Sequence, residues 1–186
     1  MRVVIGGSRH LSVIPEEVGL KIQDLMNSNA EFLVGDAPGS DWAFQMYLKK
    51  VGYKIVSVFT SAEDIRHNVG NWPYTKIESG LKSKSSAVHA FKDRHMTKFA
   101  ELGIMIWDGE SAGTLSNIID LINQGKECYL YFGPQQEFYM IDSQSSLNRS
   151  LVDYPEVFEE AHKRLDTFKS REKKRAAESN LADTLF

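Results

Sequence analysis

The sequence contains a single cysteine, little net charge and no long apolar run. One cysteine cannot form a disulfide within the chain, so we expect Cys128, which lies in an apolar segment, to be a small core residue in a reducing compartment. The formal net charge of −3 argues against a protein that mainly coats nucleic acid or an anionic membrane. No apolar run approaches the ~20 residues of a membrane-spanning helix, and the strand-like start leaves no room for a signal peptide. We therefore expect a cytoplasmic protein without a membrane partner.

The sequence also lacks the common signatures of metal and dinucleotide sites. Its five histidines show no metal-ligand spacing, so we expect neither a metal site nor a cofactor. No segment matches the G-x-G-x-x-G fingerprint or the G-x-x-x-x-G-K-[ST] P-loop. The segment GGSRH does not complete the G-x-S-x-G nucleophile elbow, because His10 occupies its last position. A serine nucleophile at Ser8 is therefore disfavoured.

Short apolar runs alternate with segments of helical period over residues 1–132. Helices are predicted at three places: after Pro15, after a cap at Ser40, and along the apolar stripe that begins at Leu115. The second of these helices has an apolar stripe that includes Met46 and Val51. The alternation predicts an α/β fold, a Rossmann-like three-layer sandwich with a mainly parallel sheet. The runs read as buried strands are 2–5, 32–34, 55–59, 104–107 and 128–132.

Two parts of the chain depart from this alternation. Residues 61–91 show no clear period, which indicates a functional loop, a lid or short irregular helices. Residues 133–186 form a C-terminal, mainly helical extension with a candidate strand at 138–141 and an amphipathic helix at 157–168. The basic run 169–175 that follows is expected to be a solvated helix end, with nucleic-acid contact as the alternative.

Three loops rich in glycine follow predicted strands, at residues 6–10, 35–41 and 108–114. Parallel strands bring these loops to one edge of the sheet, where ligands bind at the point at which the strand order reverses. If the five strands have the order 3-2-1-4-5, the first and third of these loops face each other. Glycine permits close backbone approach, and a helix N-terminus offers free N–H groups. Gly113 and Thr114 are therefore predicted to cradle a phosphate, with Arg9 or Ser8 opposite.

Four stretches of this sequence together resemble a known superfamily. IGGSR, GDAPGSDWA, a basic segment ending in Met and WDGESAGTLSNI are similar to the SLOG superfamily, which includes LOG-type phosphoribohydrolases and DprA-like proteins, and most of all to its YspA-type branch. The resemblance covers residues 1–132 and implies a Rossmann-like domain that binds a nucleotide or nucleotide-derived ligand, often as a homodimer. The chain departs from the pattern at Asn117, where LOG enzymes carry a catalytic glutamate. Lys92 stands where an arginine is expected, with Arg94 as its substitute.

Hydrolysis of an N-glycosidic bond passes through an oxocarbenium-like sugar, so it needs a nearby carboxylate and a means to activate water. An acid at Asp41 stabilises a first helical turn without any function, and Asp108 fits a loop cap. Asp36 and Glu110 are therefore the catalytic candidates. The expected ligand contacts are Gly6, Gly7, Ser8, Arg9, Gly35, Gly39, Ser40, Asp41, Lys92, Arg94, Asp108, Gly109, Ser111, Ala112, Gly113, Thr114 and Asn117.

Three functions remain open at this point. The first is an enzyme that cleaves the base from a nucleoside monophosphate. The second is a non-catalytic nucleotide-sensing module, which Asn117 favours because an amide cannot act as a general acid or base. The third is DNA binding in the manner of DprA, which the acidic charge balance disfavours.

Overall fold

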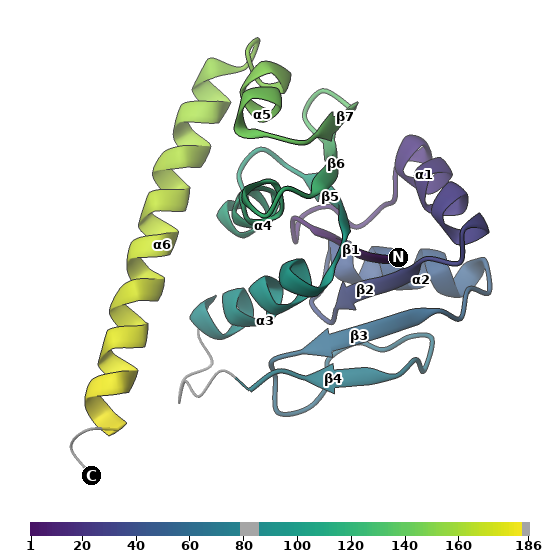
Figure 1. Ribbon diagram of the computed structural model, residues 1–186, viewed down its shortest axis with the longest axis horizontal. Coiled ribbons are helices and arrows are strands. Elements are labelled where there is room, and N and C mark those ends of the chain that lie inside the picture. Colours follow the sequence, from purple (N-terminus) through teal and green to yellow (C-terminus); the bar gives the residue numbers. More distant parts are fainter. Residues whose placement is uncertain (79–85, 184–186) are drawn as a thin grey trace.

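The structure, a computed structural model, describes residues 1–78 and 86–183, with side chains except at 86–88 and 175–183. These residues form one seven-stranded sheet of order β4-β3-β2-β1-β5-β6-β7 (Figure 1). All neighbouring strands are parallel except β6 and β7, which are antiparallel. The strands are β1 (Arg2–Gly7), β2 (Glu31–Gly35), β3 (Val56–Thr60), β4 (Tyr74–Lys76), β5 (Leu102–Trp107), β6 (Glu127–Phe132) and β7 (Glu137–Ile141).

Helices cover both faces of this sheet, which confirms the predicted α/β Rossmann-like sandwich (Figure 1). On one face, α1 and α2 pack through Ile22 and Phe44. On the other face, α3, α4 and α6 pack through Met96, Leu115 and Leu165. The helices are α1 (Glu16–Asn27), α2 (Ser40–Lys50), α3 (Ser86–Phe99), α4 (Ala112–Asn123), α5 (Gln144–Ser150) and α6 (Pro155–Asp183).

The central strands β1 and β5 lie side by side, as the predicted strand order requires. Every residue of β5 is buried, as expected for a strand with neighbours on both sides and helices on both faces. Cys128 of β6 is also buried in the core, and burial raises the pKa of its thiol. This unreactive, apolar environment agrees with the core role predicted for it.

The start and the buried face of α2 differ from the prediction. Gly39, with a φ of 85°, is the N-cap, and Ser40 is the first helical residue. The Ser40 hydroxyl does not cap the helix, because it donates instead to the carbonyl of Ser8 at 2.5 Å. Met46 and Val51 were expected in the buried stripe, but each is 40% exposed. Ala43 of the predicted stripe is buried, but the buried face is shifted round the helix so that Phe44 and Leu48 pack on the sheet beside it.

The segment 61–91 contains two elements that its lack of period hid. β4 has three residues, all exposed, so no buried side chain marks it in the sequence. α3 begins at Ser86 and continues beyond the segment to Phe99. Residues 79–85 lie outside the described part of the chain.

The C-terminal extension joins the sheet before it forms helices. β7 pairs with β6, which confirms the candidate strand, and α6 then runs for 29 residues along the outer side of α4 and α3 (Figure 1). In the basic run, Arg171, Lys173 and Lys174 are exposed, but Glu172 between them is buried. Among the described residues, no helix is long and apolar enough to cross a membrane.

Candidate functional site

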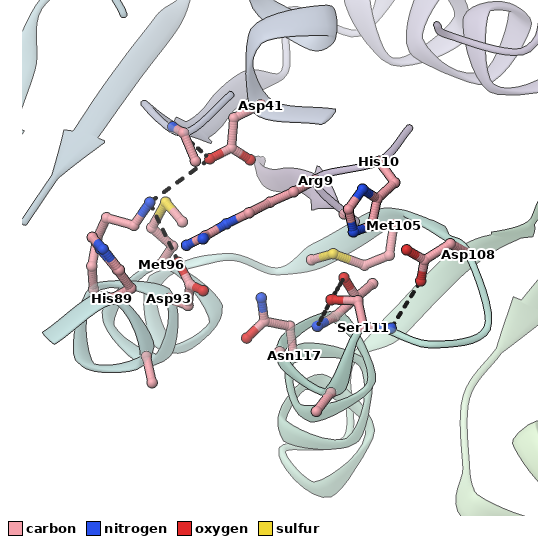
Figure 2. A pocket seen from close by; sticks show the side chains of 18 of the residues that line it. Arg9, His10, Asp41, His89, Asp93, Met96, Met105, Asp108, Ser111 and Asn117 are labelled. Carbon is pink, nitrogen blue, oxygen red and sulfur yellow. Dashed lines mark hydrogen bonds and ion pairs between the residues drawn. The ribbon is translucent and has the colours of Figure 1, made fainter. Parts of the chain in front are cut away.

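A cleft of about 400 Å³ opens at the C-terminal ends of β1 and β5. In the sheet, β1 has β2 on one side and β5 on the other. The strand order therefore reverses at β1. Open α/β sheets bind ligands at such a point. The walls come from the β1–α1 loop, from α3, from the start of α4 and from α6, and Figure 2 shows the side chains that line it.

The two loops that face each other across the cleft are joined by Ser8 and Asp108. The Ser8 hydroxyl donates to Asp108 Oδ1 at 2.8 Å, and the Asp108 N–H donates to Ser8 Oγ at 3.1 Å. The same Oδ1 accepts the backbone N–H groups of Glu110 (2.9 Å) and Ser111 (2.8 Å). Ser8 is fully buried, so its hydroxyl supports the loops from below. The next two residues of the GGSRH segment, Arg9 and His10, both line the cleft.

The first turn of α4 forms one end of the cleft. Ser111 is the N-cap, and its hydroxyl accepts from the Thr114 N–H at 3.3 Å and from the Thr114 hydroxyl at 2.9 Å. The N–H groups of Ala112 and Gly113 belong to the same turn and have no carbonyl four residues before them within the helix. A Cβ added to Gly113 would meet no atom within 4 Å, so this backbone is open to a ligand.

Arg9 crosses the middle of the cleft (Figure 2). No hydrogen bond or ion pair holds its guanidinium among the residues drawn there. Its backbone is held close to Gly39, because a Cβ on Gly39 would lie 2.2 Å from the Arg9 carbonyl oxygen. Among the described side chains Arg9 has no ion-pair partner, and its guanidinium points towards Asp93 and His89 of α3 (Figure 2).

Lys92 of α3 lies under the cleft among three carboxylates. Its side chain is 3% exposed, and its Nζ is 3.4 Å from Asp93, 3.8 Å from Asp41 and 3.9 Å from Asp36. Burial lowers the pKa of Lys92, but the three carboxylates together raise it by more than burial lowers it. The pKa of Lys92 therefore lies above its usual value. Burial raises the pKa of Asp41 above its usual value, against the opposing charge of Lys92.

Asp36 is fully buried below the cleft and holds Arg66 in place. Arg66 donates to it through Nε at 3.1 Å and Nη2 at 2.5 Å, and Thr60 donates at 2.7 Å. Burial would raise the pKa of Asp36, but these hydrogen bonds and the charge of Lys92 lower it to about 2. The guanidinium of Arg66, and not Asp36, is what lines the cleft.

His89 brings a neutral ring to the same wall. Its Nδ1 lies 2.9 Å from the Ser61 hydroxyl. Burial and the positive charges of Arg66, Lys92 and Arg9 lower the pKa of His89 below its usual value. At pH 7 the ring is therefore neutral and can accept or donate one hydrogen bond.

Two of the predicted site residues are engaged with α6. Glu110 is 69% exposed at the mouth of the cleft and pairs with Arg164 at 2.9 Å. Arg94 pairs with Glu172 at 3.0 Å and does not line the cleft, so it does not replace Lys92 there. The reason is helical geometry, since Arg94 lies two residues after Lys92 and faces another side of α3.

The structure brings most of the predicted residues together and leaves seven away from the cleft surface. The predicted residues that line it are Gly6, Gly7, Arg9, Asp41, Lys92, Asp108, Glu110, Ser111, Ala112, Gly113, Thr114 and Asn117. Those that do not line it are Ser8, Gly35, Asp36, Gly39, Ser40 and Arg94, and Gly109 faces Val157 of α6 instead. Lining residues that the sequence did not indicate include Arg66, His89, Asp93, Met96, Arg164 and Phe168.

A signal for three of these lining residues was present in the sequence. His89, Asp93 and Met96 have the spacing i, i+4, i+7 and so share one face of α3.

Within the described residues, no group of three or more histidine, cysteine or acidic side chains could hold a metal ion. Comparison of the chain with protein-family models, with curated proteins and with solved structures finds no match.

Proposed function

We propose that the protein binds a nucleotide, or a ligand derived from one, in the cleft at the β1–β5 edge. The observation that carries this proposal is that Arg9 and the open first turn of α4 line the same cleft, and that Arg9 has no ion-pair partner among the described side chains. Arginine binds phosphate through paired hydrogen bonds, and a helix N-terminus attracts anions through its dipole and its free N–H groups. Together they can hold one phosphate from two sides.

The rest of the cleft supports a ligand larger than phosphate alone. Its volume of about 400 Å³ lies in the range of small-molecule pockets. The lining combines polar groups, such as His89 and Asn117, with the apolar side chains of Met96, Met105 and Phe168. This mixture suits a sugar and a base joined to the phosphate. A nucleotide ligand also agrees with the resemblance of the sequence to the SLOG superfamily. We likewise propose that the chain belongs to that superfamily.

A second candidate function is hydrolysis of the N-glycosidic bond of the bound nucleotide. Asp93 favours it, because this carboxylate lines the cleft beside Lys92 and is 26% exposed. A carboxylate so placed could stabilise positive charge at the sugar. Of the two acids first considered, Asp36 is fully buried and does not line the cleft, and Glu110 is paired with Arg164 at its mouth. If no base is released, the same cleft is that of a nucleotide-sensing module.

Calorimetric titration with nucleoside 5′-monophosphates and their parent nucleosides tests the proposal. We expect the monophosphates to bind and the nucleosides to bind much more weakly, because only the former carry the phosphate. Gly113→Val should abolish binding while the protein still folds, since a Cβ at this position meets no atom of the surrounding protein within 4 Å. Gln144→Val in the first turn of α5 is the matched control. Equal affinity for monophosphates and nucleosides would contradict the proposal, and chromatography for free base would separate enzyme from sensor.

A further inference from the structure

The long helix α6 is fixed against the cleft at several points along its length. Ala161 and Leu165 are 1% and 4% exposed, because they pack into the core beside α4. Arg164 pairs with Glu110 across the mouth of the cleft, and Glu172 pairs with Arg94 of α3. These contacts fix the position of the segment between them.

Phe168 lies within this fixed segment and lines the cleft. It follows Leu165 by three residues and precedes Glu172 by four, so the three share one face of α6. Phe168 packs against the core cluster and also lines the cleft. With Met96 and Met105 it supplies apolar lining in a cleft that is otherwise rich in charge.

Asn117 of α4 is the polar group that accompanies this apolar lining. It comes four residues after Gly113, which places it on the same face of α4 and about 6 Å further along the helix. Its amide projects into the cleft (Figure 2). An asparagine amide offers a donor beside an acceptor, the pattern that reads the edge of a base.

Resting on the proposed function, we infer that the C-terminal helix forms the base-binding side of the nucleotide site. Phe168 stacks on the nucleobase, and Asn117 hydrogen-bonds a base edge that presents a donor next to an acceptor. The phosphate then lies one helical turn away, between Arg9 and the start of α4. The consequence is that ligand binding also stabilises α6, which would show as slower amide exchange in that helix.

Titration with two ligands distinguishes this inference from the proposed function. The first is the tightest-binding of the four common nucleoside 5′-monophosphates, and the second is ribose 5-phosphate, which has no base. Phe168→Leu keeps an apolar side chain against the core but removes the aromatic face. We expect it to weaken the monophosphate roughly 5- to 100-fold, the range for loss of one base–aromatic stack. Binding of ribose 5-phosphate should change by less than about twofold.

Asn117→Ala should likewise weaken binding of the monophosphate and leave binding of ribose 5-phosphate unchanged. Phe99→Ala is the control for loss of an aromatic side chain, and it should change the binding of neither ligand. Phe99 is an aromatic residue of α3 that is 42% exposed and does not line the cleft. The inference is overturned if wild-type protein binds both ligands equally, or if Phe168→Leu leaves the monophosphate unchanged or weakens both ligands alike. If neither ligand binds the wild type, the proposed function falls and this inference with it. Gly113→Val, by contrast, should weaken both ligands, because it acts at the phosphate.

Discussion

The ion pair between Asp36 and Arg66 makes a quantitative prediction about stability and pH. The pKa of Asp36 is lowered from 3.8 to about 2 in the folded protein, and the carboxylate is fully buried. A shift of this size corresponds to about 2.4 kcal/mol of stability at pH 7. Because the folded pKa is the lower one, this stability is present above pH 4 and is lost as the pH falls towards 2. By the same relation, about 1 kcal/mol of it should be lost between pH 5 and pH 3.

Urea denaturation of wild type and Asp36→Asn, followed by circular dichroism, tests this value. We expect the difference in free energy of unfolding between the two proteins to shrink by about 1 kcal/mol from pH 5 to pH 3. Asp24→Asn is the control, because Asp24 is 71% exposed in its pair with Lys21. A difference between wild type and Asp36→Asn that stays constant over this range would refute the argument, since it would mean that Asp36 does not titrate differently in the folded and unfolded states.

Two further predictions concern α3. Lys92→Met should lower the free energy of unfolding by about 3–5 kcal/mol, because it removes the buried positive charge that Asp36, Asp41 and Asp93 share, and unchanged urea denaturation would contradict this. If the protein hydrolyses its ligand, Asp93→Asn should abolish release of free base measured by chromatography while the nucleoside monophosphate still binds. Undiminished release from this variant would remove Asp93 from the mechanism.

The sequence was sufficient to predict the centre of the fold. β1 and β5 are short, almost wholly buried runs, and glycine-rich loops follow them, so their adjacency and the place of the cleft could be anticipated. The start of α4 was predicted to within one residue, since Gly113 and Thr114 were expected to open the helix and it begins at Ala112. These features depend on patterns within a few residues of one another.

The parts that were missed depend on contacts between distant segments. The role of Asp36 could not be read locally, because its partner Arg66 lies thirty residues away in a segment without period. The same holds for Arg94, whose partner Glu172 is 78 residues distant. That α6 is a helix follows from its own residues, but that Arg164 and Phe168 return to the cleft follows only from how α6 packs on α3 and α4.

The proposed function requires that the phosphate be held at the start of α4. The decisive measurement is the calorimetric affinity of nucleoside 5′-monophosphates for wild type and for Gly113→Val, with the melting temperature of each protein recorded in parallel. We expect wild type to bind, and Gly113→Val to lose binding while retaining a cooperative melting transition, because a Cβ at this position enters open space. A folded Gly113→Val protein that binds the monophosphate with unchanged affinity would contradict the account.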